Sequence, residues 1–253
     1  MQPEPQIAHE LLTQRLAHIV GFSDTEVELL GALLSGPQRT LGARRDLVRE
    51  GDPPRLAYLL TGGWATRYKM LEDGRRQTLA FLLPGDLCDV SNSALREMDH
   101  SIGAITPISF VEVGYDRLEQ LAGAHPRLAR AFTWQLLTNL SIQREWTLNL
   151  GRRSALERIG HLLCEIVVRL RSMGLSDDHG CDLPLTQNDI SEATGLTPVH
   201  VNRTLQDMRM RGLIVLKGRR LDIPDLGRLQ QVALFSDTYL HLHRGDASPA
   251  AAV

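Results

Sequence analysis

The chain has 253 residues, of which 43% are hydrophobic and 23% charged, and its formal net charge is −2 at pH 7. These values describe an ordinary globular protein of one or two domains and exclude a generally basic nucleic-acid coat protein. No apolar run approaches about 18 residues, and the N-terminus lacks a basic segment followed by an apolar one, so neither a membrane span nor a signal peptide is expected. The three cysteines are widely spaced and form no C-x-x-C pair, so neither a disulfide framework nor a metal site is expected. A reducing cytoplasm is the simplest setting.

The first half of the chain changes from helical to strand-like patterning. Short helices are expected near 10–20 and 24–34. From 39 to 113, glycine turns separate short apolar runs at 56–60, 64–70, 77–83, 102–105 and 109–113. Asp73-Gly74 between two of these runs is typical of a hairpin. The pairs Gly51-Asp52 and Gly85-Asp86 indicate equivalent corners on successive layers, so an antiparallel roll or sandwich is predicted.

A long helix is predicted to begin at Pro126 and to end near Leu150. Apolar residues recur along it at spacings of three and four, which is typical of a coiled-coil seam, and the economical partner is the same helix of a second subunit. The seam residues are Phe132, Leu136, Trp146 and Leu150. Asn139 and Gln143 interrupt the seam, and either fix the register of the two helices or face a ligand.

A domain boundary is expected near Gly151, and a new helix begins with the capping box of Ser154 and Glu157. A polar loop at 176–181 follows. Two short helices then flank Gly195, each with a start signal: Thr186 with Asp189 for the first, and Thr197 followed by Pro198 for the second. A final helix is expected over 226–240.

The second short helix has one apolar face, formed by Val201, Leu205 and Met208, and one polar face that carries His200, Asn202, Arg203 and Gln206. The segment 213–223 is predicted to fold into a two-stranded wing around a Lys217-Gly218-Arg219 turn. From 197 to 220 there are six basic residues and one acidic residue, a net charge of +5, although the whole chain carries −2. Two helices about a glycine turn, a wing and a local positive field together indicate a winged helix-turn-helix that binds the major groove.

In its order of elements the chain closely resembles the Crp/Fnr family of bacterial transcription regulators, over roughly 10–235. The most specific segments are YLLTGGWATRY, DGRRQTLAFLLPGD and LTQNDISEATGLTPVHVNRTLQDMRMRGLI. The resemblance implies an α+β fold: an N-terminal antiparallel β-roll of the cyclic-nucleotide-binding type with flanking helices (10–125), a long dimerisation helix (126–150) and a C-terminal winged helix-turn-helix domain (151–240). A disordered tail is expected at 241–253.

For the DNA-binding domain, the resemblance assigns a guanine contact in the major groove to Arg203, the commonest specific side-chain-to-base pairing. The neighbouring positions that set half-site preference hold Pro198, Val199, His200 and Asn202. A glutamate common in the family is replaced by Val199, so the usual half-site is not expected. Phosphate contacts are expected from Thr186, Thr197, Lys217, Arg219 and Arg220.

For the roll, cyclic-nucleotide-binding relatives carry Gly-Glu and Arg-Ser in a phosphate cassette, whereas this chain has Asp89-Val90 and His100-Ser101 in their places. An apolar valine cannot accept a ribose hydroxyl, and histidine is no permanent cation, so control by cyclic AMP is not expected. The candidate effector pocket comprises Asp89, Val90, His100, Ser101, Asn139 and Gln143. An iron–sulfur cluster would need N-terminal cysteines, which this sequence does not have. Cys88 and His100 are more typical of structural residues than of a haem or redox site. No cofactor is therefore expected.

The sequence therefore predicts a cytoplasmic, homodimeric, sequence-specific transcription regulator that binds a roughly palindromic site. The expected partners are double-stranded DNA, a second copy, RNA polymerase and an unidentified small-molecule effector, with no membrane. The alternative is a small-molecule sensor that acts mainly through protein contacts. An enzyme built on the roll is not expected, because a metal-dependent cupin needs clustered histidines and 39–113 contains only His100.

Overall fold

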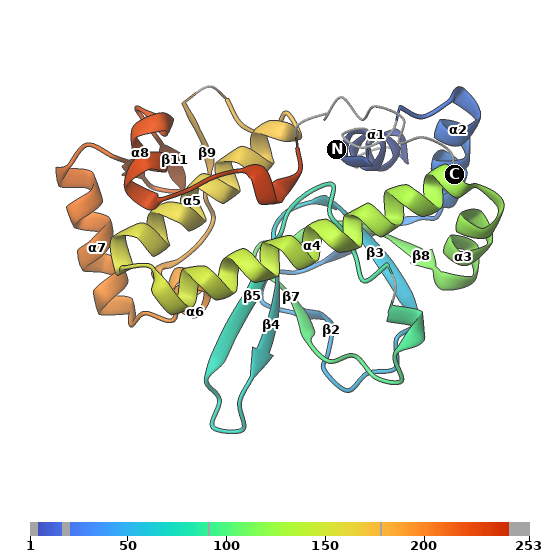
Figure 1. The fold of residues 1–253 in the computed structure, drawn as a ribbon. Helices are drawn as coiled ribbons and strands as arrows, with labels where there is room; N and C mark the ends of the chain where they lie inside the picture. Colours follow the sequence, from blue (N-terminus) through green and yellow to red (C-terminus); the bar gives the residue numbers. More distant parts are fainter. Residues whose placement is uncertain (1–4, 17–20, 91, 178, 243–253) are drawn as a thin grey trace.

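The computed structural model describes residues 5–16, 21–90, 92–177 and 179–242. The long helix α4 (Pro126–Arg152) runs the length of the molecule (Figure 1). The β-roll and the N-terminal helices lie along one part of α4, and the C-terminal domain lies at its far end. This arrangement confirms the predicted α+β fold.

Three helices cover one end of the roll. They are α1 (Pro5–Leu16), α2 (Asp24–Leu33) and α3 (Tyr115–Ala124). α2 is capped at its start, because Ser23 and Glu26 form a capping box. Leu12, Leu30 and Leu128 are fully buried in the core that joins these helices to the roll and to the start of α4.

The roll consists of two four-stranded antiparallel sheets, ordered β1-β8-β3-β6 and β2-β7-β4-β5. Each predicted apolar run is a strand: β3 (Leu56–Gly62), β4 (Ala65–Met70), β5 (Arg76–Leu82), β7 (Ser101–Ala104) and β8 (Ile108–Gly114). The sequence did not reveal β1 (Gln38–Leu41), β2 (Asp46–Val48) or β6 (Leu87–Cys88). These strands are short, and pairing with longer neighbours stabilises them more than their own patterning does.

The two Gly-Asp corners are equivalent, as predicted. Gly51 and Gly85 adopt φ angles of 89° and 91°, a region that favours glycine. In each corner the aspartate side chain accepts a hydrogen bond from the backbone N–H three residues earlier: Arg49 donates to Asp52 Oδ2 (3.1 Å), and Leu83 donates to Asp86 Oδ2 (2.8 Å). The same residue pair therefore builds the same corner on successive layers.

The faces of α4 differ from the predicted seam. Phe132 and Trp146 were predicted to contact a second subunit, but they are only 6% and 5% exposed and pack inside the protomer. Phe132 belongs to the N-terminal core, and Trp146 packs edge-on against Phe81 while its indole Nε1 donates to Glu165 (3.0 Å). Both aromatic residues are therefore unavailable to a partner, because the roll and the C-terminal domain cover this face of the helix.

A second, solvent-facing stripe on α4 carries leucines. Leu136, Leu137, Leu140 and Leu148 are between 43% and 52% exposed. Of the predicted seam, Leu136 lies on this stripe and Leu150 is partly buried. The apolar surface that a protomer leaves uncovered is thus displaced around the helix from the predicted one.

The C-terminal domain begins with α5 (Ala155–Ser172), whose predicted capping box of Ser154 and Glu157 is present. α6 (Gln187–Thr194) and α7 (Pro198–Met210) form the helix-turn-helix, and the wing contains β10 (Val215–Lys217) and β11 (Arg220–Asp222). The predicted polar loop at 176–181 is partly wrong, because β9 (Gly180–Asp182) adds a third strand beside β11. Gly180 permits this approach, since a Cβ there would lie 1.9 Å from the Leu221 carbonyl oxygen.

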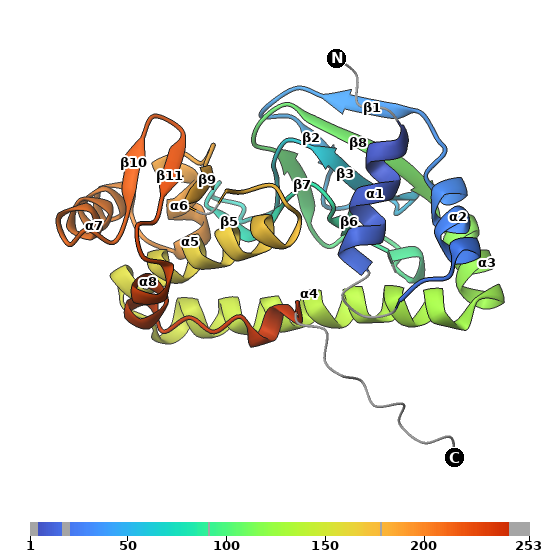
Figure 2. The same cartoon turned by 90° about the horizontal axis from the view of Figure 1, so that it is seen from above.

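The predicted single helix at 226–240 is also wrong. α8 (Leu226–Ala233) ends where Leu234 adopts a left-handed conformation, and a short 3-10 helix (Thr238–Leu240) follows. This segment turns back along α4 (Figure 2), where the Tyr239 hydroxyl donates to Glu165 (2.8 Å). The predicted tail at 241–253 lies, apart from 241 and 242, outside the described residues.

Candidate nucleic-acid interface and effector pocket

The helix-turn-helix has the geometry that its sequence predicts. Thr186 Oγ1 accepts from the Asp189 backbone N–H (3.2 Å), and Asp189 Oδ2 accepts from the Thr186 backbone N–H (2.8 Å), which completes the capping box. Gly195 ends α6 in the left-handed conformation with φ of 64°. Ser191 Oγ donates to the Leu196 carbonyl oxygen (2.5 Å) and connects α6 to the turn. These bonds fix α6 and the turn that follows it, and α6 and α7 pack in one hydrophobic core.

The helix α7 buries one face and presents the other to solvent. Val201 and Met208 are fully buried, and Leu205 is 3% exposed. On the opposite face, Arg203 is exposed, and Val199 is 80% exposed near the N-terminus of the helix. Arg203 has no hydrogen bond or ion pair with any described residue, so its guanidinium is available to an external acceptor.

The other predicted DNA contacts lie on α7 and at the start of α6. Thr197 caps α7, since its side chain accepts from the His200 backbone N–H (3.2 Å). Asn202 Oδ1 accepts from Gln206 Nε2 (2.9 Å), and this bond orients the Asn202 amide along the helix. Thr186 is exposed at the start of α6. The structure therefore brings the candidate base and phosphate contacts of both helices to the domain surface.

The wing carries three basic residues, of which two are unpaired among the described residues and one is paired with carboxylates. Lys217 and Arg219 are exposed and form no ion pair within the described part of the chain. Arg220 is instead paired with two carboxylates: it contacts Asp177, and its Nε lies 2.8 Å from Asp222 Oδ1. The Arg220 hydrogen bond, with those from two backbone N–H groups, lowers the pKa of Asp177 to about 2. The predicted phosphate contact of Arg220 is therefore not supported, because its guanidinium is already engaged by Asp177 and Asp222.

A cavity of about 290 Å³ lies between the roll and α4. Five of the six predicted effector residues line it, namely Asp89, Val90, His100, Asn139 and Gln143. Ser101 is not among the lining residues; it is buried in β7, where its hydroxyl accepts from the Glu50 backbone N–H (2.9 Å). Gln143 Nε2 donates to the Leu79 carbonyl oxygen (2.8 Å), so Gln143 faces the roll and not a partner helix.

Sequence reasoning missed Arg67, which lies in β4 and lines the same cavity. Its Nη2 donates to Asp89 Oδ1 (2.9 Å), and His100 Nε2 lies 3.1 Å from its Nε. A charged residue inside a strand-like apolar run was the available signal. Burial disfavours ionisation of Asp89, but the hydrogen bond from His100 and the charge of Arg67 outweigh it and hold the pKa of this carboxyl below its usual value. Arg67 and Lys69, which both line the cavity, are thus each paired within the chain: Arg67 with Asp89, and Lys69 with Glu50 (2.6 Å).

The structure also bears on metals, thiols and membranes. The described residues contain no group of three or more His, Cys, Asp or Glu side chains placed to hold a metal ion. Cys88 is buried, and burial raises the pKa of its thiol well above the usual value. Within the described residues, no helix has both the length and the apolar character needed to cross a membrane.

Two family models match the chain. The model of the cyclic nucleotide-binding domain matches residues 38–125, which cover the roll, and the model of the Crp-like helix-turn-helix domain matches residues 157–232. The two matches correspond to the two parts that α4 connects.

Known proteins resemble the chain over most of its length. The transcriptional activator protein FnrL of Cereibacter sphaeroides is 30% identical over 199 residues, which cover 77% of this chain and 79% of the relative. The nitrogen fixation regulation protein FixK of Bradyrhizobium diazoefficiens is 32% identical, over 70% of this chain and 73% of the relative. The structure of FixK2 from Bradyrhizobium japonicum superposes with a TM-score of 0.71 at 28% identity, over 78% of this chain and 96% of that one. With its roll, its connecting helix α4 and its winged helix-turn-helix, the chain belongs to the Crp/Fnr family of DNA-binding transcription regulators.

Proposed function

We propose that the chain is a homodimeric, sequence-specific regulator that binds a roughly palindromic DNA site and is not controlled by cyclic AMP. One observation carries the DNA-reading part: Arg203 projects from the exposed face of a capped helix without a partner among the described residues. A bidentate arginine–guanine pair needs a guanidinium that is both exposed and unengaged. Lys217 and Arg219 on the wing add cations for the phosphates.

The exposed leucine stripe of α4 supports the homodimer. Four leucines at 136, 137, 140 and 148 lie on one helix, and a second copy of α4 would remove them from water. A two-fold axis along this stripe relates the two copies of α7, which act as the recognition helices of the dimer. In helix-turn-helix dimers these enter successive major grooves about 34 Å apart, and the operator has matching two-fold symmetry. As a regulator of transcription, the dimer is expected to act on RNA polymerase at the promoter.

The cavity argues against a cyclic nucleotide as the effector. A cyclic phosphate needs a cation to pair with, but the Arg67 guanidinium is engaged by Asp89, whose side chain is 2% exposed. A bound phosphate would have to displace this carboxylate or lie close to its charge. The effector that we propose for this cavity is therefore a small molecule other than cyclic AMP.

The experiment is a selection of DNA duplexes from a random pool by the purified protein, with and without cyclic AMP, together with sedimentation of the protein alone. We expect a two-fold symmetric consensus, a dimer in solution and no change of either on addition of cyclic AMP. Selection of an asymmetric half-site by a monomer would contradict the dimer. Binding that requires cyclic AMP would contradict the assignment of the cavity.

A further inference from the structure

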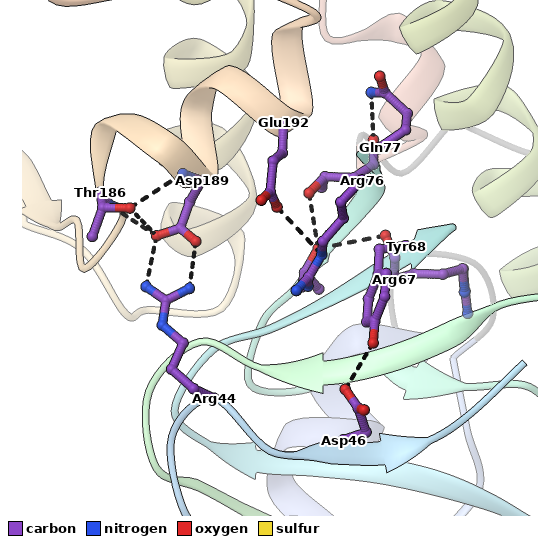
Figure 3. A network of polar contacts seen from close by, with 11 residues as sticks. Arg44, Asp46, Arg67, Tyr68, Arg76, Gln77, Thr186, Asp189 and Glu192 are labelled. Carbon is purple, nitrogen blue, oxygen red and sulfur yellow. Dashed lines mark hydrogen bonds and ion pairs between the residues drawn. The ribbon is translucent and has the colours of Figure 1, made fainter. Parts of the chain in front are cut away.

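Two arginines of the roll meet two carboxylates of α6 (Figure 3). Arg44, in the β1–β2 turn, forms a bidentate pair with Asp189, with Nη1–Oδ1 at 2.6 Å and Nη2–Oδ2 at 3.0 Å. Arg76, the first residue of β5, places its Nε 3.3 Å from Glu192 Oε2. Asp189 and Glu192 are three residues apart, so they share one face of the helix. We call these four residues the clasp.

The arginines are held in place from the roll side. The Arg76 guanidinium lies 3.5 Å from the centre of the Tyr68 ring, and the Tyr68 hydroxyl donates to Asp46 Oδ1 (2.9 Å). Arg44 adopts a left-handed conformation with φ of 60°, which costs a non-glycine residue free energy. Its backbone N–H donates to the Ala104 carbonyl oxygen (2.8 Å), and this bond holds the turn in that conformation. The roll thus holds the Arg76 guanidinium against Tyr68 and the backbone of Arg44 in a fixed turn.

On the α6 side, the clasp is connected to Thr186, the residue that caps α6. Asp189 Oδ2 accepts from Thr186 Oγ1 (2.7 Å) as well as from Arg44. Burial disfavours its ionisation, but the hydrogen bonds from Arg44 and Thr186 prevail and lower the pKa of Asp189. Since α6 and α7 bury their apolar faces in the same hydrophobic core, a contact that orients α6 also orients α7.

The clasp does not cover the candidate DNA contacts. With both ion pairs formed, Thr186, Val199 and Arg203 remain exposed. The clasp is therefore compatible with DNA binding and does not cover the residues that would contact DNA. A contact that held the domain away from DNA would be expected to bury some of them.

We infer that Arg44 and Arg76 are positioning residues for DNA binding: from the roll, they fix the orientation of the helix-turn-helix relative to α4. This inference rests on the proposed function, because the orientation matters when two recognition helices of a dimer must match two half-sites. Loss of the clasp leaves α5 attached to the roll through Arg169, which donates to the Phe81 carbonyl oxygen and to Asp86. It widens the range of orientations open to α6 and α7, and ordering these helices again on the operator weakens specific binding.

The test exchanges the charges of the Arg76–Glu192 pair, since Glu192 takes no part in the helix cap. The variants are Arg76→Glu, Glu192→Arg and the double variant, in the full chain, on a duplex selected by the wild-type protein. The matched control is Arg75→Glu, because Arg75 is exposed and pairs with Asp73 in its own turn, away from α6. We expect each single exchange to weaken operator binding roughly threefold to tenfold, and the double exchange to restore it to within about twofold. The control should bind like the wild type.

Unchanged or tighter operator binding by Arg76→Glu would overturn the inference, and so would a double exchange that fails to restore affinity. A second measurement is independent of DNA: spin labels at Met70→Cys and Met210→Cys, both exposed positions, report the distance between the roll and the end of α7. We expect the distance distribution to broaden in Arg76→Glu and to narrow again in the double exchange. An unchanged distribution overturns the clasp, whereas a wild-type protein that selects no DNA contradicts the proposed function and leaves this distance test intact.

Discussion

The cavity of the roll and the surface of α7 each carry an arginine that an anion could contact, but only one of the two is available. Arg67 is paired with Asp89 and lies beside His100, and its side chain is 16% exposed. Arg203 is exposed and has no partner in the described part of the chain. A count of basic residues does not distinguish the two sites, because the pairing of each cation decides whether it can bind a further anion.

The largest expected effect comes from removing the internal anion of the cavity. Asp89→Asn leaves Arg67 largely buried without a carboxylate, and we expect the free energy of unfolding to fall by about 2–4 kcal/mol at pH 7. The freed guanidinium should then bind an external anion, so sulfate should raise the melting temperature of this variant more than that of the wild type. Asp99→Asn is the control, because Asp99 is 74% exposed although it also contacts His100.

The pH dependence of this difference has a definite sign. The pKa of Asp89 is lower in the folded chain than its ordinary value. Its stabilisation is therefore present above the unfolded pKa and is lost as the pH falls through the folded pKa. Urea unfolding of wild type and Asp89→Asn should differ most near neutral pH and converge below about pH 4. A constant difference from pH 7 to pH 3 would show that Asp89 does not act through its charge.

The next effect concerns the unpaired arginine of α7. Arg203→Ala should weaken binding to the selected operator by about 1–3 kcal/mol and remove the preference at one base pair per half-site. Binding to operator duplexes with each base substituted in turn measures both quantities. If the variant keeps the wild-type order of preference among these duplexes, Arg203 is not the base-reading residue.

A smaller and more uniform effect is expected on the wing. Lys217→Ala should weaken binding to specific and unrelated duplexes alike, and reduce the slope of log K against log salt by about one unit. The measurement is a salt titration of binding by fluorescence anisotropy. A loss confined to the operator would assign Lys217 to base reading.

The smallest effect is expected for the paired cation of the wing. Arg220→Ala should leave the salt slope unchanged, because Asp177 and Asp222 already neutralise Arg220. Arg219→Ala, one residue away and without a partner among the described residues, is the matched comparison and should lower the slope by about one unit. Equal slopes for these two variants would remove the distinction between paired and unpaired cations on the wing.

Local signals in the sequence were sufficient for much of the fold. The capping boxes at Ser154 and Thr186, the turn at Gly195 and the Gly-Asp corners depend on residues a few positions apart, and each is present as predicted. The exposed face of α7 also followed from helical periodicity, which separates Arg203 from Val201 and Leu205.

Contacts between distant segments decided the rest. The sequence could not show that Asp89 neutralises Arg67, that Asp177 pairs with Arg220, or that Arg44 contacts Asp189, because these residues are 22, 43 and 145 positions apart. The predicted seam of α4 was wrong at Phe132 and Trp146 for the same reason. Spacing identifies an apolar stripe, but the packing of the roll and of α5 determines which stripe remains exposed. The sequence by itself thus determined most of the helices, the corners and the exposed face of α7. The tertiary structure decided which charges are paired and which apolar surface is free, since both depend on neighbours that only folding brings together.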